Sequence, residues 1–428
     1  SREPMHHHRD RPGPVFRVLA ALSATGLLAV GCGSEQPATT APTATTSIPA
    51  LRYAMPGAHA VGYRELATTG AQQQPLTVRA WYPANRSTAD PETITYTAPD
   101  KFGEQINPGE EITAVGAARP NAEPDRTAGP YPLVVFSHGY ALSPILYSTV
   151  VEHYASEGFV VLAPEHNERF EGSTTEFWAE LVDRPVDIHR TVDLAEALTA
   201  PGGELADLID VDHIAVVGHS YGGYTALAAA GARFDFAAYE DRCAALAADD
   251  PLTFFCAPIT NKPDMATRAG LEEVPAGLWP SLGDKRVDAA ISLAGDAYLF
   301  DQRGLAALEV PIMAMGGTVD DGTPYTWGAK PTYDHAASAH KTLITFPGAG
   351  HFLFLDPCDD LPWTEGFGYR DAFCVDAVWG GQRPLDIVTH YSTAFLLDTL
   401  DADPAARAAL TGVQPQLDHV EYETADRS

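Results

Sequence analysis

Residues 213–230 read HIAVVGHSYGGYTALAAA, and the interpretation of the whole chain starts from this stretch. An apolar run leads into Gly-His-Ser-Tyr-Gly, and small, helix-forming residues follow. A serine at a sharp strand-to-helix turn takes a strained backbone conformation, which small neighbours such as Gly218 and Gly222 permit. The pattern predicts a buried strand, a turn that presents the hydroxyl of Ser220, and a helix that begins at Tyr221. A glycine-rich turn with a solvated serine is the alternative, but the order of strand, turn and helix favours a nucleophile.

A serine hydroxyl is a poor nucleophile at neutral pH and needs an imidazole to remove its proton. His351 is the expected base, because it follows the last predicted strand in a loop of small residues, 347–350, that can reach back toward Ser220. The imidazole in turn needs a carboxylate to fix its tautomer, and two aspartates compete for that role. Asp320, in the loop after the strand that precedes the histidine, is favoured; Asp296, one strand earlier, remains the alternative acid.

Two backbone amides are expected to stabilise the oxyanion that forms when the serine attacks. One is the amide of Tyr221, at the positive end of the helix after the serine. The other is that of Tyr140, because a predicted strand ends in Ser-His-Gly-Tyr and the glycine lets the backbone approach a substrate closely. With Tyr298 near them, these tyrosines predict a shallow aromatic cleft for short acyl or aryl esters. If both rings of the oxyanion pair are half-buried loop aromatics instead, the amides can still act.

Around this turn, apolar runs alternate with helical patterns from residue 132 onward. Strands are expected at 133–136, 159–163, 213–217, 289–293, 310–315 and 342–346, and helices near 145–157, 186–199, 224–230 and 333–340. Strands that alternate with helices predict an α/β fold, with a mostly parallel central sheet covered by helices on both faces.

Two segments depart from this alternation. Strands are predicted at 61–66 and 76–82, but residues 84–130 are rich in Pro, Gly, Asn and Asp and are expected to form an irregular surface excursion. Residues 233–287 follow the helix after Ser220 and are expected to form a cap-like insertion or substrate wall. The carboxyl ends of parallel strands are where ligands bind in such sheets, so the insertion would border the site.

The composition sets limits on partners. The chain has 428 residues with 45% hydrophobic content, enough for one domain of roughly 300 to 350 residues. Its formal net charge is -30, from 57 acidic and 27 basic residues, which disfavours nucleic acids and anionic membrane surfaces as partners. The acidic residues are spread out, as on a well-hydrated surface, and do not point to a cation site.

The N-terminal part of the chain is typical of an export signal. Arginines precede the apolar stretch 18–30, which is short for a transmembrane helix, and Cys32 follows small residues as in a bacterial lipoprotein signal. Residues 1–32 are therefore expected to be a signal segment that lipidates Cys32, and residues 33–50, rich in Thr, Ala and Pro, a disordered tether to a domain at 51–428. Ordinary signal cleavage nearby, with the cysteine incidental, is the alternative. The expected location is the bacterial cell envelope or the medium, with membrane contact only through the lipid.

Four further cysteines suit an oxidising compartment: Cys243, Cys256, Cys358 and Cys374. Three connectivities are possible, and the short separations favour Cys243 with Cys256 and Cys358 with Cys374. A zinc site is disfavoured, because no C-x-x-C pair or closely spaced histidines accompany them.

Residues 130–355 resemble the secreted, dienelactone-hydrolase-like branch of the α/β hydrolases, and are similar to platelet-activating-factor acetylhydrolases and to cutinase-like polyester hydrolases. The resemblance to both groups lies in 136–140 and 157–161. The segment 317–324 with Gly350 and His351 resembles the polyester hydrolases and the dienelactone-like proteins, which place the acid there. The segment 295–298 instead resembles the acetylhydrolases, whose acid follows the earlier strand. True dienelactone hydrolases use a cysteine nucleophile, so the serine argues against that substrate.

The resemblance implies an α/β-hydrolase fold and an exported serine carboxylic-ester hydrolase that forms an acyl-enzyme, with no metal or cofactor. Small-molecule esters are the expected substrates, and polyesters or short-chain phospholipids are alternatives. The chain is expected to be a monomer. A non-catalytic binding protein on the same fold is the rival from a different class, and loss of a catalytic residue would be its signature.

Overall fold

The computed structural model describes residues 51–86, 93–104, 108–168, 177–366, 370–374, 376, 378–411, 417 and 419–426. They belong to one compact unit that begins at Leu51. The predicted signal segment, Cys32 and the tether lie outside the described residues. No helix in the described ranges is long and apolar enough to cross a membrane.

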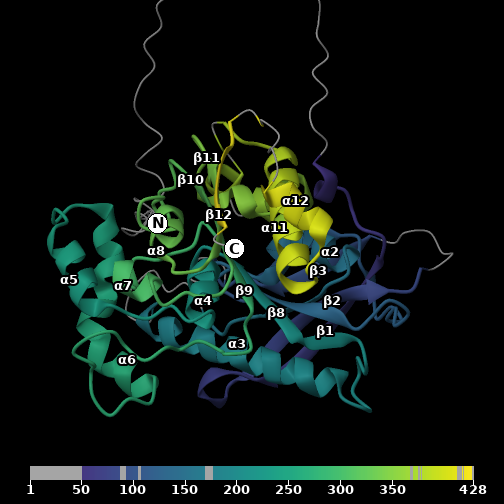
Figure 1. Cartoon of the computed structure of the whole chain (residues 1–428), viewed down its shortest axis with the longest axis horizontal. Coiled ribbons are helices and arrows are strands. Elements are labelled where there is room, and N and C mark those ends of the chain that lie inside the picture. The colour runs from purple at the N-terminus through teal and green to yellow at the C-terminus, as the bar shows by residue number, and fades with distance from the viewer. Residues whose placement is uncertain are drawn as a thin grey trace, which may run out of the picture. The chain divides into compact units, whose positions relative to one another are not determined.

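A ten-stranded sheet forms the centre of this unit, in the order β12-β11-β10-β9-β8-β6-β7-β2-β1-β5 (Figure 1). The strands are β1 (Ala60–Thr69), β2 (Pro75–Ala84), β5 (Arg119–Pro120), β6 (Tyr131–Ser137), β7 (Val160–Pro164), β8 (Ile209–His219), β9 (Ala289–Leu293), β10 (Ile312–Gly317), β11 (His340–Phe346) and β12 (Glu421–Asp426). The strands from β11 to β7 run parallel, and β12 and β2 pair antiparallel with β11 and β7. Beyond β2, β1 pairs antiparallel with β2, and β5 pairs parallel with β1. The expected mostly parallel α/β sheet is confirmed.

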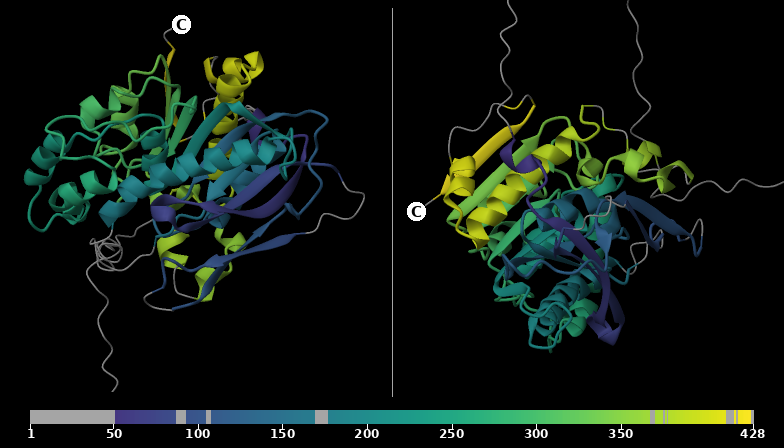
Figure 2. Two further views of the ribbon diagram at one scale, coloured as in Figure 1. Left: turned by 90° about the horizontal axis from the view of Figure 1, so that it is seen from below. Right: turned by 90° about the vertical axis from the view of Figure 1, so that its right-hand side faces the viewer.

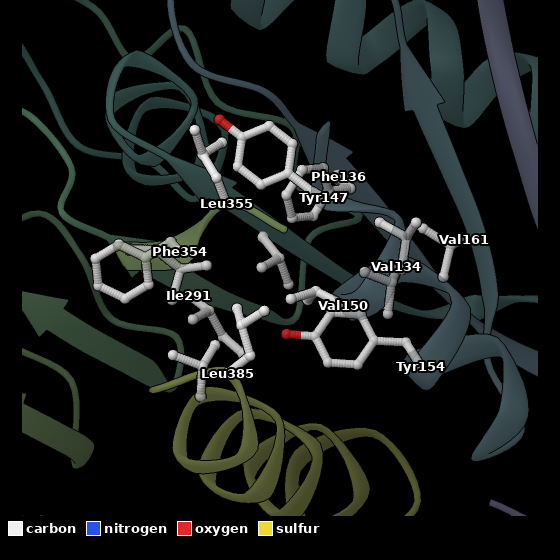
Figure 3. Packing of buried hydrophobic residues seen from close by; sticks show 14 of the residues in the cluster. Val134, Phe136, Tyr147, Val150, Tyr154, Val161, Ile291, Phe354, Leu355 and Leu385 are labelled. Carbon is white, nitrogen blue, oxygen red and sulfur yellow. The ribbon is translucent and has the colours of Figure 1, made fainter. Parts of the chain in front are cut away.

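Helices cover both faces of the sheet, because successive buried residues of each strand point to opposite sides. On one face Val134 and Ile291 pack with α2 (Ser148–Ser156) and α11 (Arg383–Leu400), and Figure 3 shows this cluster. On the other face Val135 and Leu162 pack with helices α3 (Phe177–Thr199) and α4 (Tyr221–Ala229). Figure 2 shows the yellow helix α11 and the teal helix α3 on opposite sides of the sheet. The continuous apolar strands thus have a separate core on each face.

The strand order changes direction beside β6, since β7 lies on one side of it and β8 on the other. The loops that leave the carboxyl ends of β6 and β8 therefore lead to opposite faces, and in open α/β sheets this is the point where ligands bind. The predicted oxyanion loop and the serine turn follow these two strands.

The prediction of an irregular excursion at 84–130 is wrong. This segment contains the antiparallel pair β3 (Ile94–Pro99) and β4 (Glu111–Gly116). One face of the pair is buried through alternate residues, and the buried Tyr96 hydroxyl donates a 2.6 Å hydrogen bond to Glu152 on α2. A two-residue period, overlooked among the prolines and glycines, fixes this hairpin against the core.

The expected helix at 333–340 is also misplaced. Helix α8 spans Ala329–His335, and Ala336 has left the helical region with a ψ of 133°. The Ser338 hydroxyl bonds both the carbonyl and the amide of His340, which turns the chain into β11. Helices α11 and α12 (Pro404–Thr411) lie near the C-terminus, in a part of the chain for which the sequence predicted no helix or strand.

The insertion at 233–287 contains α5 (Phe236–Ala244), the 3₁₀ segment η4 (Pro251–Asn261) and α6 (Lys262–Arg268). Cys243 and Cys256 are joined, with Cα atoms 5.9 Å apart. Cys358 and Cys374 form the other disulfide, with Cα atoms 5.8 Å apart. Both pairs are those favoured by the short separations in sequence.

Candidate active site

Ser220 lies between β8 and α4 with a φ of 57° and a ψ of -121°, the strained conformation that the motif requires. The glycines on either side are needed for space. A Cβ on Gly222 would collide with the carbonyl oxygen of Ser137, and one on Gly218 with the carbonyl oxygen of Gly222. The turn is therefore pressed against the end of β6, so the serine and the loop after β6 share one edge of the sheet.

His351 joins the serine to an aspartate from a different loop. Its Nε2 lies 2.8 Å from Oγ of Ser220, and its Nδ1 lies 2.9 and 2.8 Å from the two carboxylate oxygens of Asp320. The amides of Gly322 and Thr323 donate to Asp320 Oδ1 at 2.9 and 2.7 Å. The carboxylate is thus fixed by its own loop, and the imidazole is oriented with its second nitrogen toward the serine.

The charges at this site favour a basic imidazole. Burial alone would lower the pKa of His351, but the charge of Asp320 and its hydrogen bond outweigh burial and raise that pKa above its usual value. A carboxylate in this position also fixes the tautomer, because Nδ1 must carry the proton that is donated to it.

Asp296, the alternative acid, lies at the end of β9 and is 4% exposed. The described contacts of His351 Nδ1 go to Asp320 and to Thr323, whose hydroxyl is 3.1 Å away. Burial raises the pKa of Asp296 to about 8, an effect that the nearby imidazole opposes and Asp320 reinforces. At neutral pH the side chain is therefore held mainly as the uncharged acid.

Tyr140 and Tyr221 stand beside one another, with ring centroids 5.6 Å apart. Tyr221 is buried and its hydroxyl donates a 2.9 Å hydrogen bond to the carbonyl of Phe177, so its ring belongs to the core. Its amide begins helix α4, where the first N–H groups have no acceptor within the helix. Tyr140 is half-buried and its ring packs on Phe177 at 5.2 Å.

Tyr298 does not line an open cleft, so the prediction that it contributes to a shallow aromatic cleft is wrong. This residue is 1% exposed, and its ring packs on Tyr239 at 5.4 Å and on Phe255 at 5.2 Å, both in the insertion. The aromatic segment after β9 is therefore covered by the insertion, and Tyr298 belongs to the buried core.

His219, directly before the serine, connects three loops that the sequence could not link. The amide of Gly139 donates to the Tyr147 hydroxyl at 3.1 Å, that hydroxyl lies 2.8 Å from Nδ1 of His219, and Nε2 lies 3.0 Å from the carbonyl of His351. Only a neutral ring with its proton on Nε2 suits all three contacts. Burial lowers the pKa of His219 well below its usual value, which keeps the ring neutral.

A groove of about 820 Å³ lies elsewhere, between α2, the start of α11 and the segment before β1, and none of Ser220, His351 and Asp320 lines it. Among the described residues, no group of three or more His, Cys, Asp and Glu side chains could hold a metal ion.

Comparison with known proteins places this geometry in context. The chlorophyllase family matches residues 119–270, which include Tyr140 and Ser220. Platelet-activating factor acetylhydrolase of Canis lupus familiaris is 33% identical over 147 residues, which is 25% of this chain and 33% of that protein. The Bos taurus protein of that name is 29% identical over 143 residues, 24% of this chain and 32% of its own length. The chain spans about a third of the length of these curated relatives.

A ferulic acid esterase structure from Streptomyces cinnamoneus matches with a TM-score of 0.52 at 20% identity, over 88% of this chain and 97% of that one. The chain has the α/β-hydrolase fold. The resemblance to α/β hydrolases near the platelet-activating factor acetylhydrolases, first indicated by the motifs, is confirmed.

Proposed function

We propose that this α/β hydrolase is a serine carboxylic-ester hydrolase. Ser220 is the nucleophile, His351 is the general base, and the carboxylate of Asp320 orients and stabilises His351. The observation that carries the proposal is the continuous chain of contacts from the serine Oγ through both imidazole nitrogens to a carboxylate. The match to acetylhydrolases and the ferulic acid esterase neighbour support the ester class.

The geometry supports acyl transfer in two halves. His351 Nε2 takes the proton of Ser220 as Oγ bonds to the ester carbonyl carbon, and Asp320 stabilises the imidazolium. The carbonyl oxygen becomes an oxyanion beside the amides of Tyr221 and Tyr140. Collapse breaks the bond to the alcohol oxygen, which receives the proton from Nε2. Water then attacks the acyl-enzyme by the same proton transfers and releases the acid and free Ser220.

The test compares Ser220 with a buried serine, Ser338, that precedes β11 at the amino ends of the parallel strands. Ser220→Ala should lower hydrolysis of 4-nitrophenyl acetate by about 10³-fold or more while folding is retained. Ser338→Ala is the control and should retain most turnover, because the Ser338 hydroxyl bonds only the backbone of His340 among its described contacts. A fluorophosphonate should add its mass to Ser220 alone. Ordinary turnover by pure, folded Ser220→Ala would end the proposal, and absence of both turnover and labelling in the wild type would favour a binding protein.

The half-buried Tyr140 and the buried aromatic residues around it favour short acyl or aryl esters over long-chain triglycerides. A nitrophenyl ester series from acetate to palmitate should therefore peak at short chains. Short-chain phospholipid esters are the second candidate, because the curated relatives are acetylhydrolases by name. A polyester film is the polymeric candidate, and release of soluble acid from each substrate ranks the three.

Export with lipidation at Cys32 is also proposed, on the signal-like pattern ahead of it. The two disulfides of the domain suit an oxidising compartment. Metabolic labelling with palmitate should mark the wild type and not Cys32→Ser. Recovery of an unprocessed N-terminus from the cytosol would refute the location.

A further inference from the structure

A fully buried arginine on α3 lies directly behind the loop that carries Tyr140. Arg184 is 0% exposed, and the hydrogen bonds of its guanidinium go to this loop, to the end of β6 and to one glutamate. The guanidinium also lies over the ring of Tyr221, 4.9 Å from its centroid. Nη1 donates to the carbonyl of His138 at 2.7 Å, and Nη2 donates to the carbonyl of Gly139 at 3.2 Å. Nε and Nη2 also donate to the two carboxylate oxygens of Glu168, the former at 2.8 Å. The arginine thus holds the two carbonyls that precede Tyr140.

Glu168 holds the other side of the same residue. Its Oε1 accepts a 2.7 Å hydrogen bond from the amide of Ala141. Ala141 has a φ of 53°, a left-handed conformation that a residue with a Cβ adopts only when its surroundings impose it. The pair Arg184 and Glu168 therefore fixes the backbone immediately before and after Tyr140, and with it the direction of the Tyr140 amide.

The base of the loop is held by a second array of Ser, His and Asp. The Ser137 hydroxyl lies 2.9 Å from Nε2 of His166, whose Nδ1 lies 2.8 Å from the carboxylate of Asp187. Arg184 Nη1 reaches the same hydroxyl at 3.3 Å. Ser137 and His166 are 0% exposed, so this array has no access for a substrate and acts as an anchor.

Stability alone gives no reason for such an arrangement. Replacing a buried ion pair by apolar side chains of similar volume is often neutral or stabilising, because desolvation of the two charges offsets their attraction. What the apolar replacement lacks is directional hydrogen bonds to particular backbone atoms.

We propose that Arg184 and Glu168 are positioning residues that hold the Tyr140 amide toward the oxyanion. The proposal rests on the serine-hydrolase function proposed above. It implies that the pair acts on the transition state, where the negative oxygen forms, more than on the bound ester.

The variants are Arg184→Met, Glu168→Gln and the double variant, which leaves no unpaired buried charge. Loss of one oxyanion donor typically lowers turnover by about 10²-fold or more, so we expect a fall in kcat of about that size with KM within about threefold. An arylboronic acid, whose tetrahedral adduct carries the oxyanion, should lose affinity in parallel. Arg286→Met is the matched control, because it breaks an ion-pair cluster with Asp284, Asp193 and Glu196 on the surface and should leave kcat unchanged.

Amide hydrogen exchange of the peptide spanning 137–142 gives a readout that needs no activity. Exchange should be faster in the double variant than in the wild type and unchanged in Arg286→Met. Unchanged exchange, or unchanged kcat and boronate affinity in the folded double variant, would overturn the proposal. If Ser220 is not the nucleophile, the wild type fails the labelling test while the exchange result still decides whether the pair holds the loop.

Discussion

Two buried aspartates act electrostatically on the imidazole of His351, and which of them serves the reaction is the sharpest question at the scale of residues. Asp320 bonds His351, whereas Asp296 is buried nearby and largely uncharged. Asp320→Asn should lower turnover by about 10⁴-fold, because the amide favours the wrong tautomer of the imidazole. Asp296→Asn should lower turnover far less. Turnover of the two variants on the same nitrophenyl ester decides the matter, and the reverse ranking would assign the acid to the earlier strand.

The raised pKa of Asp296 also predicts how stability depends on pH. Its pKa is about 8 in the folded chain and near 3.9 when unfolded. Between these values the native state binds the extra proton, so the free energy of unfolding falls as pH rises through the window. Asp296→Asn removes this dependence, and its stability relative to the wild type should increase from pH 5 to pH 9. Urea unfolding at pH 5 and pH 9 measures the difference in stability between the variant and the wild type. Asp321→Asn is the control, because Asp321 is exposed.

At the scale of elements, the C-terminal disulfide segment supports the histidine loop. Asp376 Oδ2 accepts a 2.8 Å hydrogen bond from the Gly350 amide, and Phe373 packs on Phe352 at 4.5 Å, on either side of His351. The Cys358 to Cys374 bond closes this segment. Replacing both cysteines by alanine should lower the free energy of unfolding by about 2 to 4 kcal/mol and also lower kcat.

The other disulfide provides the matched comparison for this prediction. The Cys243 to Cys256 disulfide closes a loop of similar length but has no described contact with the His351 loop, and Cys243→Ala with Cys256→Ala removes it. It should therefore lower stability by a similar amount with a smaller effect on kcat. Equal losses of kcat in the two double variants, measured well below their melting temperatures, would mean that the C-terminal segment does not position the histidine.

Strands were most predictable where both of their faces are buried over several consecutive residues. The strand at 289–293 was placed at its observed bounds, and those near 133, 159 and 342 within a few residues, because their apolar runs are continuous. The hairpin of β3 and β4 was missed because each of its strands buries only alternate residues beside prolines. Helix α11 was missed although Pro384 near its start and its apolar period are visible in the sequence.

At the scale of the whole molecule, the site divides into a part that sequence could indicate and a part that it could not. Ser220, His351 and Asp320 follow strands at positions typical of the fold, so local patterns locate them. Arg184 and Glu168 meet only because α3 folds back beneath the loop after β6, and neither carries a motif. Residues that support a site through packing and hydrogen bonds across distant segments need the three-dimensional structure.

The insertion at 233–287 also has to be judged from the whole molecule, because a lipase-type lid would have to leave the surface it covers. Its Tyr239, Met265 and Trp279 are each at most 1% exposed. Ion pairs hold it near the C-terminal ends of α5 and α6, with Arg242 2.7 Å from Asp301 and Arg268 Nε 2.7 Å from Asp183. Opening would expose these aromatic and aliphatic surfaces to water, at a free-energy cost of about 25 cal/mol per Å² of apolar area.

We therefore expect the insertion to act as a fixed wall and the enzyme to show no interfacial activation. The rate of tributyrin hydrolysis should follow a simple saturation curve through the solubility limit of the substrate. Arg268→Met removes the ion pair with Asp183 on α3 and should loosen the insertion. This variant should therefore hydrolyse emulsified substrate faster, relative to soluble ester, than the wild type does. A sharp rise in wild-type rate when the emulsion first forms would mean that the buried aromatic residues are uncovered at the oil surface, and that residues 233–287 are a lid after all.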